Sequence, residues 1–253
     1  MRPSFVRQVL REMIVAFQFL TRIPMPSIPF GATSLSSSIR FFPFVGLVIG
    51  ASAALLQHVL LPHLPRPIVA FALVLYLVLL TGCLHEDGLA DTADGFGGGW
   101  SKEQILAIMK DSRIGSYGAT ALFLSLLARY LMLALLPLEH FTAYLISAHV
   151  LCRWTSLPLG YFLPAARQND GQGAQIASMT SLSSLIFGSI FSAAVVILAL
   201  RWSAVKPILT ALIAVVLSGW IYSKKIGGVT GDCFGATTQL TEVAVYLCGE
   251  WHP

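Results

Sequence analysis

Long apolar runs alternate along the chain with short polar segments. Most of these runs are long enough to cross a bilayer as helices, and the last one is shorter: they lie at about 39–62, 67–84, 117–137, 141–163, 184–202, 206–223 and 236–249. Their uniformly apolar character excludes the strands of a membrane barrel, in which apolar and polar residues alternate. The pattern therefore predicts an all-α fold, a polytopic membrane helical bundle of about six or seven transmembrane helices.

The N-terminal segment, 1–38, has a different pattern. Basic residues precede a short apolar stretch from Met13 to Leu20, and Thr21-Arg22-Ile23-Pro24 interrupts it. The stretch is too short to span a membrane, and no small-residue cleavage site of a signal peptide follows it. We expect a retained amphipathic helix at the membrane interface. The rest shows no linker, so we expect a single integral membrane domain, 1–253.

The amino-acid composition is typical of a membrane protein, so we expect the lipid bilayer as a partner. Hydrophobic residues make up 56% of the chain and charged residues 11%, and the mean hydropathy is +0.76, far from the average of soluble proteins. The net charge of +4 suits a protein that rests on anionic lipid. No basic stripe with interleaved aromatics occurs, so we expect no nucleic-acid partner. The cysteines lack metal-binding or redox spacing, and we assign them no role.

The basic residues predict the orientation. With a cytoplasmic N-terminus, eleven of the 16 Lys and Arg fall on the cytoplasmic side. Three fall on the other side and two lie within predicted spans: Arg66, Arg201 and Lys206, then Arg129 and Arg153. This bias places three polar loops in the cytoplasm: 85–116, 164–183 and 224–236.

Carboxylates are concentrated in the polar segment 85–116, which holds six of the twelve in the chain. Asp87, Asp91 and Asp94 are spaced i, i+4 and i+7, so on a helix they share a sector of ~60° on one face. Like charges so close repel one another, and a divalent cation relieves the repulsion. Carboxylate oxygens are the ligands that Mg²⁺ prefers beside substrate phosphates. The spacing favours a cytoplasmic Mg²⁺ site over a solvated acidic helix end.

Glycines and cations follow this motif. Gly97-Gly98-Gly99 should end the carboxylate helix, and a second short helix should run from about Lys102 to Lys110. Asp111 is then placed to close the metal site across the helical hairpin. Lys110 and Arg113 offer cations for phosphate oxygens, with the better geometry on the arginine. For Lys110, a lysine that reaches to the membrane surface is the alternative.

A second polar cluster lies at 231–242, on the same predicted side. Asp232 and Glu242 enter the last apolar run, where an ionisable residue is costly and is commonly functional. For Asp232, the alternative is a cap at the start of the last helix.

Five stretches resemble, in order, those of the cobalamin synthase family, the adenosylcobinamide-GDP ribazoletransferases. They are FLTRIPMP (19–26), FFPFVGLVIG (41–50), HEDGLADTADGFGGG (85–99), IMKDSRIGSYG (108–118) and GDCFGATTQLTE (231–242). The resemblance covers nearly the whole chain, and the block 85–118 is its most specific part. It implies a multi-pass enzyme of the bacterial inner membrane that needs Mg²⁺ as its cofactor. The implied reaction joins adenosylcobinamide-GDP to α-ribazole, or to α-ribazole 5′-phosphate, and gives adenosylcobalamin, or its 5′-phosphate, and GMP.

Roles can be assigned for such a transfer, in which an alcohol attacks the phosphorus bound to cobinamide. Positioning, charge neutralisation and a base are its main demands. One or two Mg²⁺ would be held by four carboxylates: Asp87, Asp91, Asp94 and Asp111. Asp94, nearest the glycine turn, and Asp232 are the predicted catalytic residues. The predicted substrate-binding residues are Lys110, Arg113, Arg22 and Glu242.

Two other function classes share some of these sequence features. A CDP-alcohol phosphotransferase of phospholipid synthesis also uses aspartates in a helical membrane bundle, but Asp91 stands where its pattern has arginine, and DSRIG has no place in it. It remains the alternative. An ion transporter predicts inverted repeats and carboxylates near mid-membrane, which the sequence lacks. The oligomeric state is left open, and a homo-oligomer is compatible with the sequence.

Overall fold

A computed structural model of the chain describes residues 5–28, 32–167, 176–177 and 180–250. Within these ranges the fold is helical apart from one isolated bridge between Ala165 and Val229, which confirms the predicted all-α class. Parts of two predicted segments lie outside the described residues: 1–4 and 29–31 of the N-terminal segment, and 168–175 and 178–179 of the loop 164–183.

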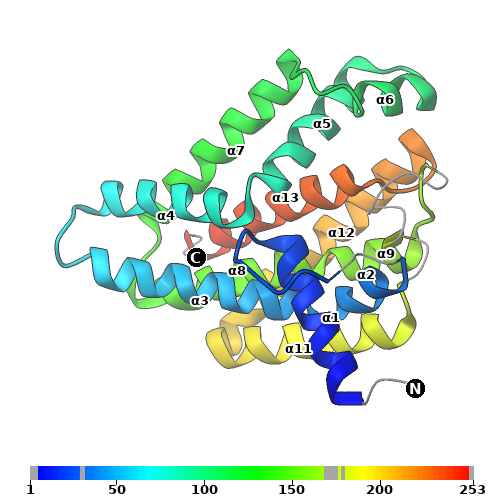
Figure 1. Ribbon diagram of the computed structural model, residues 1–253. Helices are drawn as coiled ribbons and strands as arrows, with labels where there is room; N and C mark the ends of the chain where they lie inside the picture. Colours follow the sequence, from blue (N-terminus) through cyan, green and yellow to red (C-terminus); the bar gives the residue numbers. More distant parts are fainter. Residues whose placement is uncertain (1–4, 29–31, 168–175, 178–179, 251–253) are drawn as a thin grey trace.

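The helices follow the predicted apolar runs closely (Figure 1). In chain order they are α1 (Phe5–Leu20), α2 (Ala32–Ser38), α3 (Phe42–Leu60), α4 (Arg66–Thr81), α5 (Leu84–Gly98), α6 (Lys102–Ile108), α7 (Ser116–Leu135), α8 (Leu138–Trp154), α9 (Ser156–Phe162), α11 (Leu182–Leu200), α12 (Val205–Ile226) and α13 (Gly231–Glu250). Short 3-10 turns precede α3 and α12: η1 (Ile39–Phe41) and η2 (Arg201–Ala204). The run 141–163 divides into α8 and α9, and α13 is longer than the predicted segment 236–249.

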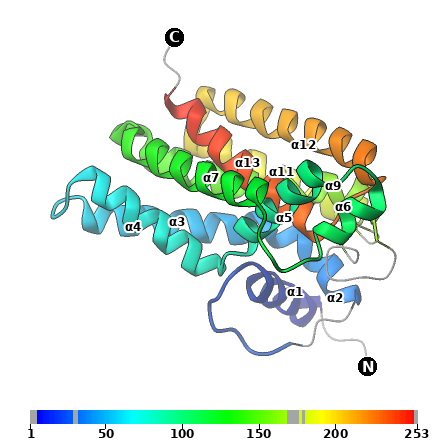
Figure 2. The ribbon, with the colours of Figure 1, turned by 90° about the horizontal axis from the view of Figure 1, so that it is seen from above.

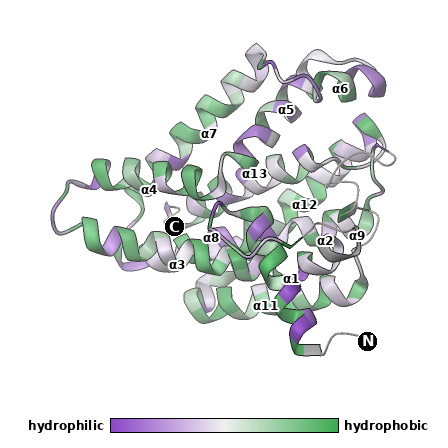
Figure 3. Ribbon diagram, in the orientation of Figure 1, coloured by the Kyte–Doolittle hydropathy of each residue, from purple (hydrophilic) through white to green (hydrophobic). Residues whose placement is uncertain are grey.

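Three stretches are long and apolar enough to cross a membrane: Leu35–Leu60, Ser116–Leu135 and Leu182–Ile226. The last contains α11 and α12, which run in opposite directions (Figure 1). A fourth candidate is α4 with α5, which meet at 87°, and we treat α4 as the crossing and α5 as the polar segment that turns away from it. Figure 3 shows apolar residues along α3, α4 and α7. The membrane bundle is confirmed, and the predicted six or seven crossings stay a prediction.

Helix α8 lies at the centre of the bundle and packs against α3, α11 and α13. Every residue of α8 from Ser147 to Trp154 is buried, so this half of the helix contacts protein on all sides. Helix α1 lies against α2 and α3 at the edge of the bundle (Figure 2). It buries Val15, Ala16 and Leu20 but exposes Val6 and Leu10, a two-sided pattern that suits the predicted interfacial helix.

The connections between helices gather at two ends of the molecule (Figure 1). At one end, a Cβ on Gly227, after α12, would lie 3.6 Å from Nζ of Lys102, at the start of α6. At the other end, Nη2 of Arg66 donates a hydrogen bond of 2.6 Å to the carbonyl of Leu136, between α7 and α8. The polar loops predicted to share one side of the membrane therefore lie together.

Candidate active site

The acidic motif forms helix α5, as predicted, and the triple glycine ends it at Gly98. Along α5 the side chain of Asp87 is exposed, that of Asp91 is half-buried and that of Asp94 is buried. The three predicted ligands therefore share a helix and differ in their surroundings.

Helix α13 brings a fourth carboxylate, Asp232, to α5. The two helices cross at glycines: a Cβ on Gly88 would lie 2.8 Å from the backbone carbonyl oxygen of Asp232, and a Cβ on Gly235 would lie 3.2 Å from Cα of Gly88. Larger side chains would push the helices apart, because real Cβ atoms do not approach so closely. The first turn of α13 thus lies directly on the acidic face of α5, and Thr230 rather than Asp232 caps it, through a 3.3 Å bond from the Cys233 amide.

Asp87, Asp91 and Asp232 form a group of like charges, which we call the acidic cluster. Burial raises the pKa of Asp91 to about 7, with further contributions from Asp87, Asp232 and Asp94 against an opposing one from Arg167. Burial also raises the pKa of Asp232, and Arg167 again opposes the shift. Within the protein, the positive charge near the acidic cluster therefore does not balance the negative charge of its three carboxylates.

These residues fit a divalent cation. Carboxylates of two helices lie close enough to repel one another. This repulsion adds to burial in raising the pKa of Asp91, and a bound cation would remove it. Asp87 also lines a cavity, so a cation that it helps to hold would be reachable by a substrate. The sequence prediction of a metal site is consistent with this arrangement.

The acidic cluster borders a cavity of about 250 Å³, which we call the central cavity. Its charged lining is Asp87, Arg167 and Asp232, and most of the remaining wall is apolar, with Phe19 and Phe234 among its members. A mainly apolar pocket with a few converging polar groups is typical of small-molecule sites.

Arg167 is a site residue that no sequence motif marks. Its Nη2 donates a hydrogen bond of 2.7 Å to the carbonyl of Leu106 in α6, and its charge lowers the pKa of both Asp91 and Asp232. The bridge between Ala165 and Val229 fixes the backbone on which it sits. The only sequence signal is a single arginine in a polar loop on the predicted active side, which is too common to select it.

Asp94 has a structural role that the spacing does not predict. Its two carboxylate oxygens accept hydrogen bonds from the amides of Gly115, at 2.7 Å, and Gly118, at 2.8 Å. These amides begin α7, where unpaired N–H groups and the helix dipole favour an anion. A Cβ on Gly118 would lie 2.2 Å from the Asp94 carboxylate, so the contact requires glycine. Asp94 ties α5 to α7, and its predicted roles as ligand and base stay predictions.

Asp111 and Arg113 bind each other in the loop between α6 and α7. Nη2 of Arg113 lies 2.6 Å from Oδ2 of Asp111, and Nε lies 3.0 Å from Oδ1. These bonds hold the pKa of Asp111 at about 2. Arg113 is 87% exposed, and Asp111 is not among the charges that shift the pKa of Asp91. In this structure the pair faces solvent, so the predicted closing of the metal site by Asp111 stays a prediction.

The remaining predicted cations are both exposed. Lys110 lies just beyond the end of α6, and Arg22 lies just beyond the end of α1. Arg22 shares with Asp87 the lining of a second cavity, of about 440 Å³. The structure therefore brings Arg22 next to the acidic cluster, from a segment far away in the sequence.

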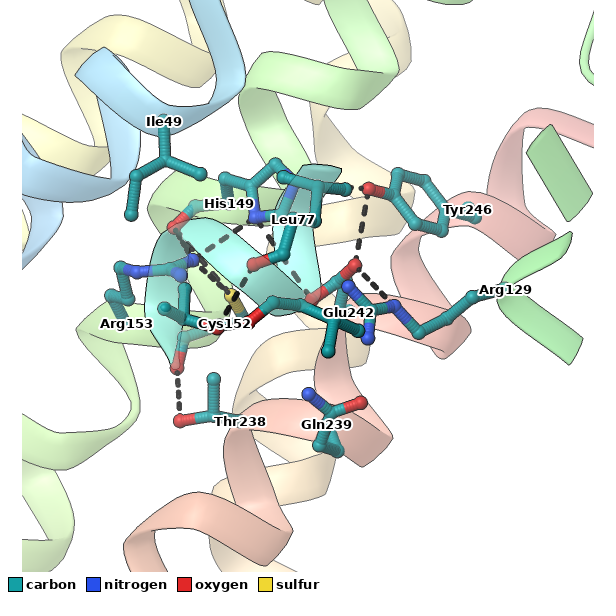
Figure 4. Close-up of polar contacts among 12 residues, drawn as sticks. Ile49, Leu77, Arg129, His149, Cys152, Arg153, Thr238, Gln239, Glu242 and Tyr246 are labelled. Atoms are coloured by element: carbon teal, nitrogen blue, oxygen red, sulfur yellow. Dashed lines mark hydrogen bonds and ion pairs between the residues drawn. The ribbon is translucent and has the colours of Figure 1, made fainter. Parts of the chain in front are cut away.

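Glu242 lies inside the bundle and is 2% exposed. Its Oε1 accepts hydrogen bonds from Nε of Arg129, at 2.9 Å, and from the hydroxyl of Tyr246, at 3.3 Å. Figure 4 shows Glu242 between these two residues and His149. This position favours a structural role, and the predicted contact with substrate stays a prediction.

Arg129 joins three helices behind the acidic cluster. Besides Glu242 of α13, it binds Glu86 of α5 through a 2.6 Å ion pair, and Gln239 donates a 3.1 Å bond to the same oxygen. Glu86 immediately precedes the first residue of the acidic cluster. An arginine within a predicted span is the sequence signal for such a network, because an intramembrane charge must be paired.

Ligand-type atoms of His149, Cys152 and Glu242 also lie within 4.8 Å of one another. However, Nη1 of Arg153 lies 3.0 Å from Nδ1 of His149, and Arg129 binds Glu242. Two guanidinium groups beside the same atoms oppose the binding of a cation. The acidic cluster is therefore the better candidate metal site.

Known proteins were compared with the chain. The family model of cobalamin-5-phosphate synthase matches residues 12–249. A protein of Shewanella piezotolerans named adenosylcobinamide-GDP ribazoletransferase is 39% identical over 250 residues, which cover 95% of each chain. Proteins of the same name from a Polaromonas species and from Vibrio cholerae are 38% and 34% identical, again over 95–97% of each chain. No solved structure matches the chain. The matched region includes every site residue described above.

Proposed function

The chain belongs to the cobalamin-5-phosphate synthase family, and from this premise we propose that it joins adenosylcobinamide-GDP to α-ribazole or α-ribazole 5′-phosphate. A hydroxyl of the acceptor attacks the phosphorus attached to cobinamide. The new P–O bond forms as the bond to GMP breaks, and the hydroxyl proton passes to a base. The products are adenosylcobalamin, or its 5′-phosphate, and GMP.

The observation that supports this reaction most directly is that two members of the acidic cluster, Asp87 and Asp232, line the central cavity together with Arg167. Arg167 offers a guanidinium to the phosphate oxygens of the donor, for which arginine is well suited. The apolar wall accepts the less polar parts of a large substrate. The residues thus provide positioning and charge neutralisation, the main demands of phosphoryl transfer.

We place a magnesium ion with Asp87 and Asp91 on α5. When bound, Mg²⁺ neutralises pyrophosphate charge and activates the leaving group. Asp232, in the first turn of α13, lines the central cavity together with Asp87. Its raised pKa favours proton uptake, so we assign it the role of general base. Asp94 is left to hold the start of α7, since both of its oxygens already accept backbone hydrogen bonds.

We also propose that the site faces the cytoplasm from the bacterial inner membrane. The polar loops that carry most of the Lys and Arg lie at the same end as the acidic cluster, and positive charge marks the cytoplasmic side. Nucleotides and Mg²⁺ are then available to the site directly.

Purified protein in detergent tests the reaction. With Mg²⁺, adenosylcobinamide-GDP and α-ribazole 5′-phosphate, we expect GMP and the corrinoid product in equal amounts. Asp232→Asn should abolish turnover without a change in thermal unfolding, and Glu103→Gln, an exposed carboxylate of α6, is the matched control. Turnover of a CDP-alcohol with a second alcohol, and none of adenosylcobinamide-GDP, would replace this proposal with the phospholipid reaction.

A further inference from the structure

The second cavity, which we call the Arg22 cavity, differs from the central cavity in most of its lining residues. It measures about 440 Å³, and its polar lining consists of Gln18, Thr21, Arg22, Thr81, Cys83 and Asp87. Arg22 is its one cation among the described residues. Asp87 is the one anion of this lining among the described residues. Burial raises the pKa of the Cys83 thiol, which is therefore neutral.

The backbone places Arg22 over the turn between α4 and α5. Its amide donates a hydrogen bond of 2.7 Å to the carbonyl of Leu80. Gly82 ends α4 with φ +64°, a left-handed conformation that favours glycine. A Cβ at this position would lie 2.0 Å from Nε of Arg22. The turn thus favours glycine for its backbone, and without a side chain at Gly82 the Arg22 side chain can lie directly over it.

The guanidinium of Arg22 is available to a ligand. Arg22 is exposed, and within the described residues its guanidinium makes no hydrogen bond or ion pair and interacts electrostatically with the Cys83 thiol. A phosphate matches it in charge and in geometry, because arginine presents paired donors to phosphate oxygens.

The same cavity holds an acceptor group without a partner. Oε1 of Gln18 is buried and accepts no hydrogen bond from the described residues. The hydroxyls of Thr21 and Thr81 already donate to the carbonyls of their own helices, at 2.7 and 2.9 Å. A buried acceptor without a partner is costly. Gln18 lines the cavity, and a rotation of its amide towards the cavity would bring this oxygen within reach of a sugar hydroxyl.

The two cavities meet at the acidic cluster. Asp87, Phe19 and Leu84 line both of them. The central cavity has Arg167 and Asp232 and suits the pyrophosphate of the donor. A second substrate that must reach the same phosphorus can approach from the other side of Asp87.

We propose that the Arg22 cavity binds the acceptor as a nucleoside monophosphate, with its phosphate on Arg22 and its sugar beside Gln18. This inference rests on the proposed function, since it names the site of the second substrate. Arg22 then makes the enzyme prefer the phosphorylated acceptor over the free nucleoside.

The test compares two acceptors, α-ribazole 5′-phosphate and α-ribazole, in detergent without phospholipid. Arg22→Gln should lower kcat/KM for the phosphorylated acceptor by roughly tenfold to a hundredfold, the effect of a lost charged hydrogen bond. Its kcat/KM for the free nucleoside and its KM for the donor should stay unchanged. Gln18→Leu should lower kcat/KM for both acceptors equally. Arg11→Gln, at an exposed arginine of α1 outside the cavity, is the matched control.

Other outcomes separate the possible errors. An equal loss with both acceptors, or a raised KM for the donor in Arg22→Gln, would overturn the acceptor site. So would an effect that appears only after addition of phosphatidylglycerol vesicles, because Arg22 would then bind a lipid headgroup. No turnover by the wild type with either acceptor would instead count against the proposed function.

Discussion

At the scale of single residues, Asp87 is the exposed member of the acidic cluster and borders both cavities. Asp87→Asn removes one anion from the proposed metal site, so we expect kcat/KM to fall by at least about a hundredfold, equivalent to about 3 kcal/mol of transition-state stabilisation. Steady-state assays over a range of Mg²⁺ concentration measure this. Asp111→Asn should be milder, since Asp111 binds Arg113. If Asp111→Asn and Asp87→Asn lowered kcat/KM equally, Asp111 would be a metal ligand, as the sequence predicts.

Asp91 gives the site a pH dependence. Its pKa is raised to about 7 from an ordinary value near 4, so the folded protein keeps a proton that the unfolded chain loses first. Metal-free stability should therefore fall as pH rises from about 4 to 7 and then level off. Mg²⁺ must displace this proton, so its affinity should rise about tenfold per pH unit up to pH 7. The Mg²⁺-induced rise in Tm, measured at pH 6 and pH 8, reports it, and Asp91→Asn should abolish the difference.

The candidate residues divide into those that spacing reveals and those that it cannot. Asp87 and Asp91 were predictable, because one helix carries both and their separation alone fixes a shared face. Arg167 was not, because its position depends on a bridge to a segment more than 60 residues away. Asp94 satisfies the same spacing rule as Asp87, yet its carboxylate binds the amides of α7. Spacing shows which face a residue occupies and does not show which neighbour that face meets.

At the scale of elements, Asp94 links α5 to α7. Asp94→Asn keeps one acceptor oxygen and loses the charge, so we expect the free energy of unfolding to fall by about 1.5–3 kcal/mol, with the donor KM little changed. Thermal unfolding in detergent and donor titration measure the two effects. A loss of kcat at unchanged stability would instead assign Asp94 to proton transfer, as its place in the motif predicts.

Arg129 links α5, α7 and α13 through Glu86 and Glu242. Arg129→Met leaves two buried carboxylates without their partner, so we expect a loss of about 3–5 kcal/mol in the free energy of unfolding. Adding Glu86→Gln and Glu242→Gln removes the unpaired charges and should restore most of the stability. If the triple variant is no more stable than Arg129→Met, the network does not act through charge pairing.

The helices themselves were largely predictable because each needs only an apolar run and a stop signal. Helix α5 ends at its triple glycine, and α6 begins with a capping box of Ser101 and Gln104. The contact of α5 with α13 was not predictable. This contact depends on the close approach of Gly88 and Gly235. The sequence shows that a helix contains a glycine, but it does not show which other helix will pack there.

At the scale of the whole molecule, the fold separates two ends. Helix α6 and the turn between α12 and α13 lie at one end, and the turns after α3 and α11 lie at the other (Figure 1). Asp232, in the first turn of α13, belongs to the first end. Apolar surfaces on the helices between them match a bilayer (Figure 3). The distribution of Lys and Arg along the sequence predicts the same two sides. That prediction does not use the structure, and the arrangement of the helices does not use the charges. Agreement between them supports one membrane orientation for all site residues.

Cysteine labelling tests this orientation directly. With Cys83, the exposed native cysteine, replaced by serine, single cysteines in 97–103 and 224–230 should react with an impermeant reagent only from the cytoplasmic side. Cysteines in 63–66 and 203–205 should react only from outside. These positions lie in the connections after α3 and α11, on the side predicted to carry few Lys and Arg. If 97–103 and 224–230 label from opposite sides, α5 and α13 cannot place Asp87 and Asp232 at one cavity, and the acidic cluster fails as an active site. If both label only from outside, the cluster survives but must obtain its nucleotide substrate across the membrane.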